Sequence, residues 1–175
     1  MTKLSAMCKF PVQVATRGTT IVAAAQMMRE GHAGALVVVD DNGPRAKPIG
    51  IVTDRDIVVA IVALDLDPNV FLLDDLLNRP LVVAKGDQSI REGLALMNAK
   101  GIRRLPVVSK AGALIGIVAL DDLIAEIARD LKQVADVIER EITKELELRP
   151  ARIRARKANV AKDRDKKPVS RGTTA

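Results

Sequence analysis

A pattern of apolar and polar segments occurs twice along the chain. Residues 21–28 (IVAAAQMM) and 34–39 (GALVVV) are matched 69 positions later by residues 90–97 (IREGLALM) and 103–108 (RRLPVV). Each copy begins with a run rich in Ala, Leu and Met, which is typical of a helix, and continues with a Val-rich run typical of a buried strand. A constant offset between such segments indicates two copies of one structural unit.

The surrounding pattern completes a β-α-β-β-α unit in each copy. A polar turn before each helix ends at Thr20 or Ser89, whose side-chain oxygens suit the N-cap position. After the Val-rich strand we expect a Gly-containing turn, a further strand and a closing helix. The remaining predicted strands, in the first and second copy, are 12–14 and 81–84, then 49–53 and 114–118, and the closing helices begin at Asp54 and Leu120.

Neither copy has enough apolar sequence for a core of its own. A three-stranded sheet with one bare face has to bury that face, and the other copy is the obvious partner. We therefore predict an α/β (α+β) fold in which the two sheets pack face to face with pseudo-two-fold symmetry. Two equivalent clefts are expected between the copies, which span residues 5–65 and 74–128.

A longer helix with a single apolar stripe is predicted for residues 121–148. Its large apolar residues recur at spacings of 3 and 4, the period of one helix face. So long a helix protrudes unless its stripe finds a surface, either on a second copy of the chain in a homodimer or on its own domain. The stripe consists of Ile124, Ile127, Leu131, Val134, Ile138, Ile142 and Leu146.

The positive charge of the chain is concentrated at its end. The chain carries 28 Lys and Arg against 22 Asp and Glu, and ten of the basic residues lie in 149–175. Pro150 is expected to end the long helix, because proline disrupts a helix interior. The segment after it lacks apolar periodicity, so residues 151–175 are interpreted as a disordered basic tail. Such a tail binds nucleic acid or an acidic protein, or only solubilises the chain.

Composition excludes several classes of function. A single cysteine, Cys8, and a single histidine, His32, provide no disulfide and no ligand set for zinc, which fits a reducing cytoplasm. Phe10 and Phe71 are the sole aromatic residues, too few for stacking on single-stranded nucleic acid. No signal peptide, membrane-spanning stretch or catalytic motif is found in the sequence. We therefore expect a cytoplasmic protein that is not an enzyme and does not enter a membrane.

The strand-to-helix junction Gly50–Asp56 (GIVTDRD) carries groups that suit a ligand. Glycine allows close approach to the backbone, a helix N-terminus presents free amides, and Thr53 and Asp56 direct short oxygens to one place. A carboxylate there can accept hydrogen bonds from both hydroxyls of a ribose. The alternative is an ordinary N-cap, in which Thr53 or Asp54 caps the helix and Asp56 stabilises its dipole.

The duplicated unit resembles a tandem CBS-domain pair, or Bateman module. The resemblance rests on the motif Gly50–Asp56, the strand Leu105–Val108 and the second junction Gly116–Asp122 (GIVALDD), and covers about residues 5–128. It implies a stand-alone regulatory protein in signal transduction, without catalysis. The implied ligand is AMP, ADP or ATP, or else NAD or S-adenosylmethionine, in one or both clefts.

The resemblance also assigns roles to individual residues. Thr53 and Asp56 would hold the ribose in the first cleft. Arg103 and Arg104 match positions that approach the phosphates of the nucleotide held by the opposite repeat, where the planar guanidinium suits phosphate oxygens. The alternative is a pair of solubilising surface arginines. Cys8 aligns with a position that lines a cleft, or is a small buried residue.

The second cleft departs from the family pattern. Asp122 is present, but Ala119 stands where the motif has threonine, and Gly34 and Ala35 stand where the other copy has its two arginines. A phosphorylated ligand is therefore expected in the first cleft. The second is either empty or holds a less charged adenosine derivative.

Three functions are compatible with these observations. In the first, a nucleotide bridges the repeats and shifts the closing helices, which requires that it bind one arrangement better than the other. In the second, residues 151–175 bind nucleic acid or an acidic partner, and the paired repeats serve as a dimerising platform. In the third, the protein is a structural dimer with empty clefts.

Overall fold

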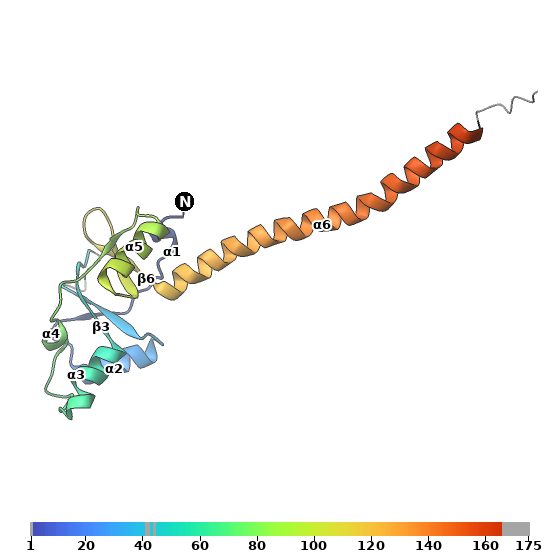
Figure 1. Cartoon of the computed structure of the whole chain (residues 1–175). Coiled ribbons are helices and arrows are strands. Elements are labelled where there is room, and N and C mark those ends of the chain that lie inside the picture. Colours follow the sequence, from blue (N-terminus) through green and yellow to red (C-terminus); the bar gives the residue numbers. More distant parts are fainter. Residues whose placement is uncertain (1, 41–42, 44, 166–175) are drawn as a thin grey trace, which may run out of the picture. The chain divides into compact units, whose positions relative to one another are not determined.

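The structure is a computed structural model that describes residues 2–40, 43 and 45–165. The chain divides into two compact units, Met1–Ala125 and Glu126–Ala175. The first unit contains both repeats, and the described part of the second is the continuation of one long helix (Figure 1).

The first repeat forms the predicted β-α-β-β-α unit. The central strand of its sheet pairs parallel with the first strand across the intervening helix, and antiparallel with the third strand. A parallel pair needs such a crossover connection, whereas an antiparallel pair needs only a turn. The elements are β1 (Val14–Thr16), α2 (Ile21–Glu30), β2 (Ala35–Val39), β3 (Pro48–Thr53) and α3 (Asp54–Ala60), followed by the short 3-10 helix η1 (Val62–Leu64).

The second repeat has the same topology. Its sheet order is β4-β5-β6, again with one parallel and one antiparallel pair. The elements are β4 (Ala84–Lys85), α5 (Ile90–Lys100), β5 (Arg104–Val108), β6 (Leu114–Ala119) and the beginning of α6 (Leu120–Asp165).

The two predicted N-caps are confirmed. The hydroxyl of Thr20 accepts a hydrogen bond from the amide of Ala23 at 3.2 Å, and the hydroxyl of Ser89 accepts one from the amide of Glu92 at 3.3 Å. Each bond satisfies an amide that the first turn of a helix leaves unpaired.

The first strand of the chain begins later than predicted, at Val14 instead of Val12. The residues just before it pair elsewhere, because Lys9 forms a bridge with Ile117 in the sheet of the second repeat. The chain therefore joins β2 only where Val14 lies opposite Val37. Pairing with a distant strand cannot be inferred from local apolar patterning.

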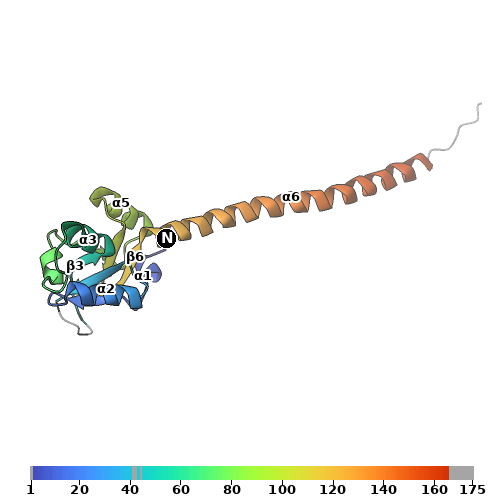
Figure 2. The same cartoon turned by 90° about the horizontal axis from the view of Figure 1, so that it is seen from below.

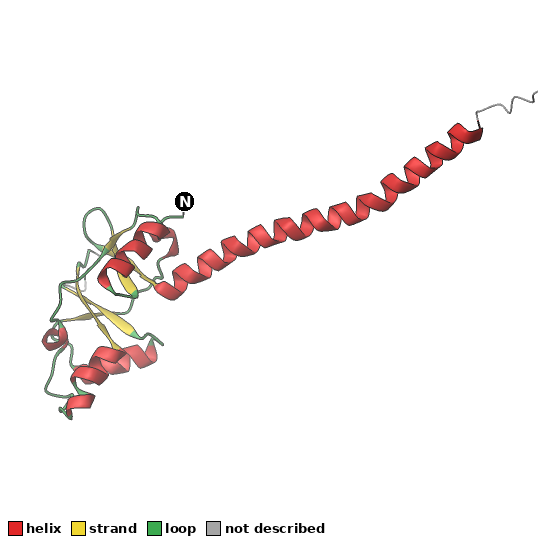
Figure 3. Cartoon of the chain, in the orientation of Figure 1, coloured by secondary structure: helices red, strands yellow, loops and turns green. Residues whose placement is uncertain are grey.

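The two sheets pack face to face, as predicted, with their helices on the outside (Figure 3). All of β2 is buried. Leu36 and Val38 point into the core beneath the helices of the first repeat, whereas Val37 and Val39 are buried outside that core. Because successive residues of a strand face opposite sides, the second pair lies on the face that the other sheet covers.

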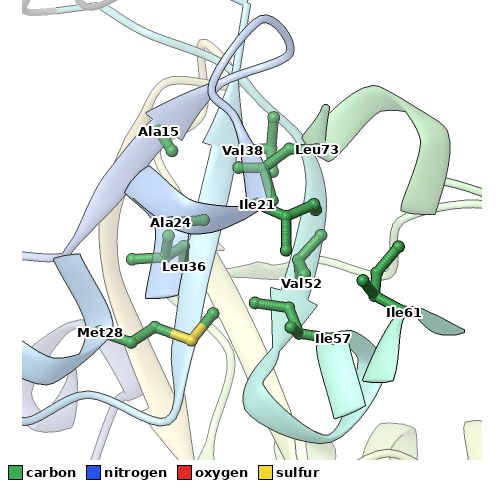
Figure 4. Close-up of a cluster of buried hydrophobic side chains, with 10 residues drawn as sticks. All are labelled: Ala15, Ile21, Ala24, Met28, Leu36, Val38, Val52, Ile57, Ile61 and Leu73. Carbon is green, nitrogen blue, oxygen red and sulfur yellow. The ribbon is translucent and has the colours of Figure 1, made fainter. Parts of the chain in front are cut away.

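The core of the first repeat is aliphatic (Figure 4). Side chains from α2, β2, β3 and α3 meet there, and α2 and α3 contact each other on the same side of the sheet in both views of the chain (Figures 1 and 2). The labelled side chains are Ala15, Ile21, Ala24, Met28, Leu36, Val38, Val52, Ile57, Ile61 and Leu73.

A short helix precedes the first strand of each repeat and packs in the core of the other. These helices are α1 (Leu4–Met7) and α4 (Leu73–Leu76), again 69 positions apart. Leu4 lies in the core of the second repeat and Leu73 in the core of the first. The amide of Leu4 donates to the carbonyl of Gln88 at 2.8 Å, and that of Leu73 donates to Thr19 at 2.9 Å. The exchange is therefore pseudo-symmetric.

The long C-terminal helix is confirmed, but the prediction that it ends at Pro150 is wrong. Helix α6 continues to Asp165, so residues 151–165, which we expected to be disordered, are helical. Proline removes one backbone donor from a helix, yet the Ala, Arg and Lys residues that follow are among the best helix formers and need no apolar stripe. Residues 166–175, the rest of the predicted tail, lie outside the described part of the chain.

Candidate ligand-binding site

The first site consists of Gly34, Thr53, Asp54, Asp56 and Arg104. Thr53 ends β3 and caps α3, because its hydroxyl accepts from the amide of Asp56 at 3.2 Å. The Oδ2 atom of Asp56 accepts in return from the amide of Thr53 at 2.8 Å and from its hydroxyl at 2.6 Å. The N-cap interpretation of this motif is therefore confirmed. A carboxylate has acceptor sites beyond these two bonds, so capping does not prevent it from binding hydroxyl groups.

Arg104 extends from the second repeat to the beginning of α3. A Cβ atom on Gly34 would lie 3.1 Å from Nη2 of Arg104 and 3.2 Å from Oδ2 of Asp54. A guanidinium from one repeat and a carboxylate from the other thus both border Gly34, a residue without a side chain. The absence of a Cβ at Gly34 is what gives Arg104 room beside the first turn of α3.

Arg103 lies differently. Its side chain is exposed, and its carbonyl oxygen accepts from the amide of Leu120 at 2.8 Å, within the second repeat. The equivalent bond in the first repeat joins the amide of Asp54 to the carbonyl of Gly34 at 3.3 Å. In the part of the chain that the structure describes, the side chain of Arg103 forms no ion pair with the first site. Its predicted role in phosphate binding stays a prediction.

The second site consists of Cys8, Lys9, Gly116, Ala119 and Asp122. The Oδ2 atom of Asp122 accepts from the amide of Ala119 at 3.0 Å, which corresponds to the bond between Asp56 and the amide of Thr53. Its other oxygen, Oδ1, forms an ion pair with Nζ of Lys9 at 2.7 Å. Asp122 is only 16% exposed, against 73% for Lys9. The carboxylate of the second site is therefore already neutralised by the chain itself.

Cys8 is a packing residue of the second site. Its thiol lies directly over Gly116, where an added Cβ would be 2.4 Å from the sulfur. The thiol donates weak hydrogen bonds to the carbonyls of Ser5 at 3.4 Å and Ile115 at 3.7 Å. Burial raises the pKa of the Cys8 thiol, which disfavours the reactive thiolate. The position that we expected either to line a cleft or to be buried is half-buried at this site.

Lys9 and Leu77 are residues that the sequence interpretation missed. The offset of 69 relates Cys8 to Leu77 and Lys9 to Asn78. Leu77 covers Gly50 as Cys8 covers Gly116, since an added Cβ on Gly50 would lie 2.3 Å from Cδ2 of Leu77. Applying the same offset to the segment before the first strand would have identified both residues.

This pseudo-symmetry reveals an electrostatic difference between the sites. Where the second site has the ammonium group of Lys9, the first has the neutral Asn78. The described residues form four ion pairs, and none of them includes Asp56. The carboxylate of the first site is thus exposed without a cationic partner among these residues, and the guanidinium of Arg104 lies close to the same helix start.

Comparison with known proteins assigns the family. The CBS-domain family model matches residues 4–63 and 73–129, so the chain belongs to the CBS-domain family as a tandem pair. Hypoxic response protein 1 of Mycobacterium tuberculosis is 39% identical over 118 residues, covering 67% of this chain and 77% of that protein. The uncharacterized protein MK0525 of Methanopyrus kandleri is 38% identical over 105 residues, or 60% of this chain, but the match spans only 52% of its length.

Solved structures share the fold. The crystal structure of Hypoxic Response Protein I with two coordinated zinc ions superposes with a TM-score of 0.61 at 35% identity, covering 71% of this chain and 98% of that one. The CBS domain protein PAE2072 from Pyrobaculum aerophilum, complexed with AMP, gives a TM-score of 0.64 at 24% identity, covering 73% and 99%. At that identity the second comparison concerns the fold alone.

No group of three or more His, Cys, Asp or Glu side chains in the described part of the chain is arranged to hold a metal ion. None of its helices is both long enough and apolar enough to cross a membrane.

Proposed function

We propose that the protein is a regulatory module that binds one adenosine-containing nucleotide per chain, of the AMP, ADP or ATP type, at the first site. The observation that carries the proposal is the difference between two equivalent aspartates. Asp122 is paired with Lys9 at 2.7 Å, whereas Asp56 has no ion-pair partner among the described residues.

The chemistry of the first site matches two parts of such a ligand. Asp56 accepts hydrogen bonds from the two ribose hydroxyls, and the capping box with Thr53 holds its carboxylate in place beforehand. Arg104 binds the phosphate, for which a planar guanidinium offers two parallel donors. A ligand held in this way contacts both repeats.

The second site is a poor place for the same ligand. A ribose there has to displace Lys9 from a carboxylate that is 16% exposed. Breaking the pair with the exposed Lys9 costs little by itself, but it is a cost that the ribose does not meet at the exposed carboxylate of Asp56. Ala119 also lacks the hydroxyl that Thr53 supplies in the first site. We therefore assign the nucleotide to the first site alone.

Binding becomes regulation if the ligand prefers one arrangement of the repeats. The first site joins the start of α3 to the start of β5, so a nucleotide that bridges these elements favours the arrangement in which both touch it. The fold is shared with PAE2072, which was crystallised with AMP. AMP is therefore the first compound to test.

The test is isothermal titration calorimetry with AMP, ADP, ATP, NAD and S-adenosylmethionine on the wild type and two matched variants. Asp56→Ala and Asp122→Ala each remove a carboxylate that accepts a hydrogen bond from the backbone amide of the residue before the helix. The two variants therefore lose a comparable capping interaction. Asp56→Ala should weaken binding roughly 10- to 100-fold, the effect of hydrogen bonds to a charged group of about 1.5–3 kcal/mol. Asp122→Ala should bind as the wild type does.

Two results would overturn the proposal. One is equal loss of affinity in both variants, which would show that the effect comes from helix capping or that both sites bind. The other is a wild type that binds none of the five compounds, in which case the protein is not an adenosine-nucleotide sensor.

A further inference from the structure

Helix α6 contains two stretches whose positive charges have different surroundings. In the first, 126–148, four Lys and Arg are accompanied by seven Asp and Glu. Arg129 pairs there with Glu126, and Lys132 pairs with Asp136 at 2.8 Å. Pairs of opposite charge at spacings of three and four residues stabilise a helix. The positive charges of the first stretch therefore find acidic partners on the helix itself.

The second stretch, residues 150–162, has no acidic residue in its sequence, and we call it the basic segment. It belongs to the same continuous helix, which extends to Asp165. Arg152 and Arg156 are four residues apart, a spacing at which like charges repel and destabilise a helix. The side chains of Arg156 and Lys157 are exposed. The five positive residues of the basic segment are Arg152, Arg154, Arg156, Lys157 and Lys162.

The composition of the basic segment indicates the kind of partner that it fits. Its large apolar residues are Ile153 and Val160. A protein partner usually requires a buried cluster of aromatic or apolar anchors, and an anionic membrane surface requires an apolar helix face. Nucleic acid requires neither, because Lys and Arg side chains bind by neutralising the phosphates of its backbone. Nucleic acid is therefore the polyanion that this segment matches best.

The helical form of the basic segment favours duplex DNA among the nucleic acids. Proteins that bind single strands stack the bases on aromatic side chains, but the chain has no Trp or Tyr, and both Phe10 and Phe71 lie outside α6. The segment is a helix about 20 Å long at 1.5 Å per residue. The major groove of B-form DNA, about 12 Å wide, admits such a helix, whereas that of duplex RNA is too narrow.

We propose that the basic segment of α6 binds the phosphates of duplex DNA without sequence specificity. Three of its five positive residues are arginines, whose planar guanidinium groups suit bidentate contacts with phosphate oxygens. Bound phosphates also offset the repulsion between Arg152 and Arg156, which the helix cannot relieve with acidic residues of its own. The inference goes beyond nucleotide binding at the first site and does not depend on it.

Fluorescence anisotropy of a labelled DNA duplex of mixed sequence, titrated with the full-length protein, tests the proposal. Two matched double variants each remove two positive charges from α6. One combines Arg152→Gln with Arg156→Gln in the basic segment. The other combines Arg129→Gln with Lys132→Gln in the stretch where positive residues have acidic partners. Glutamine has a helix propensity close to those of Arg and Lys, and circular dichroism verifies that the helix content is unchanged.

The wild type should bind the duplex with an affinity that falls steeply as the salt concentration rises. Each phosphate that a protein neutralises contributes about 0.9 to the slope of log affinity against log salt. The Arg152 and Arg156 double variant should therefore lower that slope by about 1.8, and it should weaken binding roughly tenfold or more at about 0.05 M salt. The Arg129 and Lys132 double variant should bind as the wild type does.

Three results would overturn the proposal. The first is a wild type that does not bind the duplex even at low salt. The second is an equal loss of affinity in both double variants, which would make the net charge responsible and not the basic segment. The third is polyglutamate competing as well as unlabelled duplex at equal charge, which would assign the segment to an acidic protein. AMP binding can succeed or fail independently, because neither double variant changes a residue of the first site.

Discussion

The first and second sites occupy equivalent places in two copies of one unit, yet they offer a ligand different chemistry. In both sites, the carboxylate at the third position of a helix accepts a hydrogen bond from the backbone amide of the residue just before that helix. In the first, that carboxylate is exposed, and Arg104 approaches the same helix start from the other repeat. In the second, Lys9 neutralises it. Duplication thus reproduces the backbone frame, and a few side chains decide which copy can bind.

The source of the difference is the exchanged segment before each first strand. This segment carries α1 or α4 into the core of the opposite repeat and then passes over the glycine of its third strand. In one case it brings Cys8 and Lys9, in the other Leu77 and Asn78. A segment needed for folding therefore also determines the electrostatics of the site it covers.

The largest expected effect on this comparison comes from Arg104→Ala. AMP affinity should fall roughly 10- to 100-fold, since charged hydrogen bonds contribute about 1.5–3 kcal/mol. The affinity for adenosine, which lacks the phosphate, should not change. Arg103→Ala is the control, because its side chain is exposed and forms no ion pair among the described residues. A larger loss in Arg103→Ala, measured by calorimetry, would place the phosphate elsewhere.

The two strand glycines should differ in their tolerance of a methyl group. In Gly116→Ala the new Cβ would meet both Sγ and Cβ of Cys8, at 2.4 and 2.5 Å, and the carbonyl of Lys9 at 3.3 Å. These atoms can move away only if the segment that carries Cys8 and Lys9 separates from β6. Overpacking of this kind lowers the free energy of unfolding by about 1–3 kcal/mol.

Gly50→Ala is the matched variant of the first repeat. Its new Cβ meets the end of the Leu77 side chain, at 2.3 Å from Cδ2, and that end can rotate away. Urea unfolding should therefore show a smaller loss of stability for Gly50→Ala than for Gly116→Ala. The reverse order would mean that the segment carrying Leu77 is held more rigidly than the one carrying Cys8.

Lys9→Gln should make the second site resemble the first. The stability loss should be below about 1 kcal/mol, because an ion pair with one exposed partner contributes little. With Asp122 released, the variant should bind a second, weak equivalent of adenosine that the wild type does not bind. Calorimetric stoichiometry measures this, and a variant that still binds one equivalent would show that Lys9 is not what closes the second site.

The smallest expected effect concerns the pH dependence of the two N-caps. Hydrogen bonds from the side chain and amide of Ser89 lower the pKa of Glu92 from its ordinary value of 4.5. A lowered folded-state pKa means that the contribution is complete above 4.5 and is lost as the pH falls through the folded-state value. Glu92→Gln should thus reduce the acid sensitivity of unfolding below pH 4.5.

The equivalent helix of the first repeat supplies the control. Thr20 caps α2, but its third position is Ala23, which does not titrate. Thr20→Ala should lower the free energy of unfolding by about 1 kcal/mol, the usual value for a lost N-cap. This loss should be the same at every pH in the acid range. A pH-dependent cost in Thr20→Ala would argue against assigning the acid sensitivity to Glu92.

Much of the fold could be predicted from the sequence because the same pattern of apolar and polar residues occurs in both copies. The offset of 69 gave the β-α-β-β-α order, the N-caps and the packing of sheet on sheet. The exchange of α1 and α4 could not be predicted, because helices of four residues leave no periodic signal and their partners are distant in sequence. The helix over residues 151–165 was missed because we took the lack of apolar periodicity as a sign of disorder. The intrinsic helix preference of the Ala, Arg and Lys residues in this segment favours a helix without such periodicity.

The candidate site was predictable in its residue types but not in its electrostatics. Thr53 and Asp56 could be identified from one motif, and an N-cap at Thr53 or Asp54 was the stated alternative, whereas the reciprocal bonds of Asp56 to Thr53 were not predicted. The ion pair of Lys9 with Asp122 joins residues more than a hundred positions apart, and no local pattern predicts such a pair. That contact is what distinguishes the two sites.

The most direct test of this account is the crystal structure of the protein grown with excess AMP. The account predicts electron density for one nucleotide per chain, with its ribose hydroxyls within hydrogen-bonding distance of Asp56 and its phosphate beside Arg104. The ion pair between Lys9 and Asp122 should be intact in the same crystal. Density for the nucleotide at Asp122 with Lys9 displaced, and none at Asp56, would contradict it.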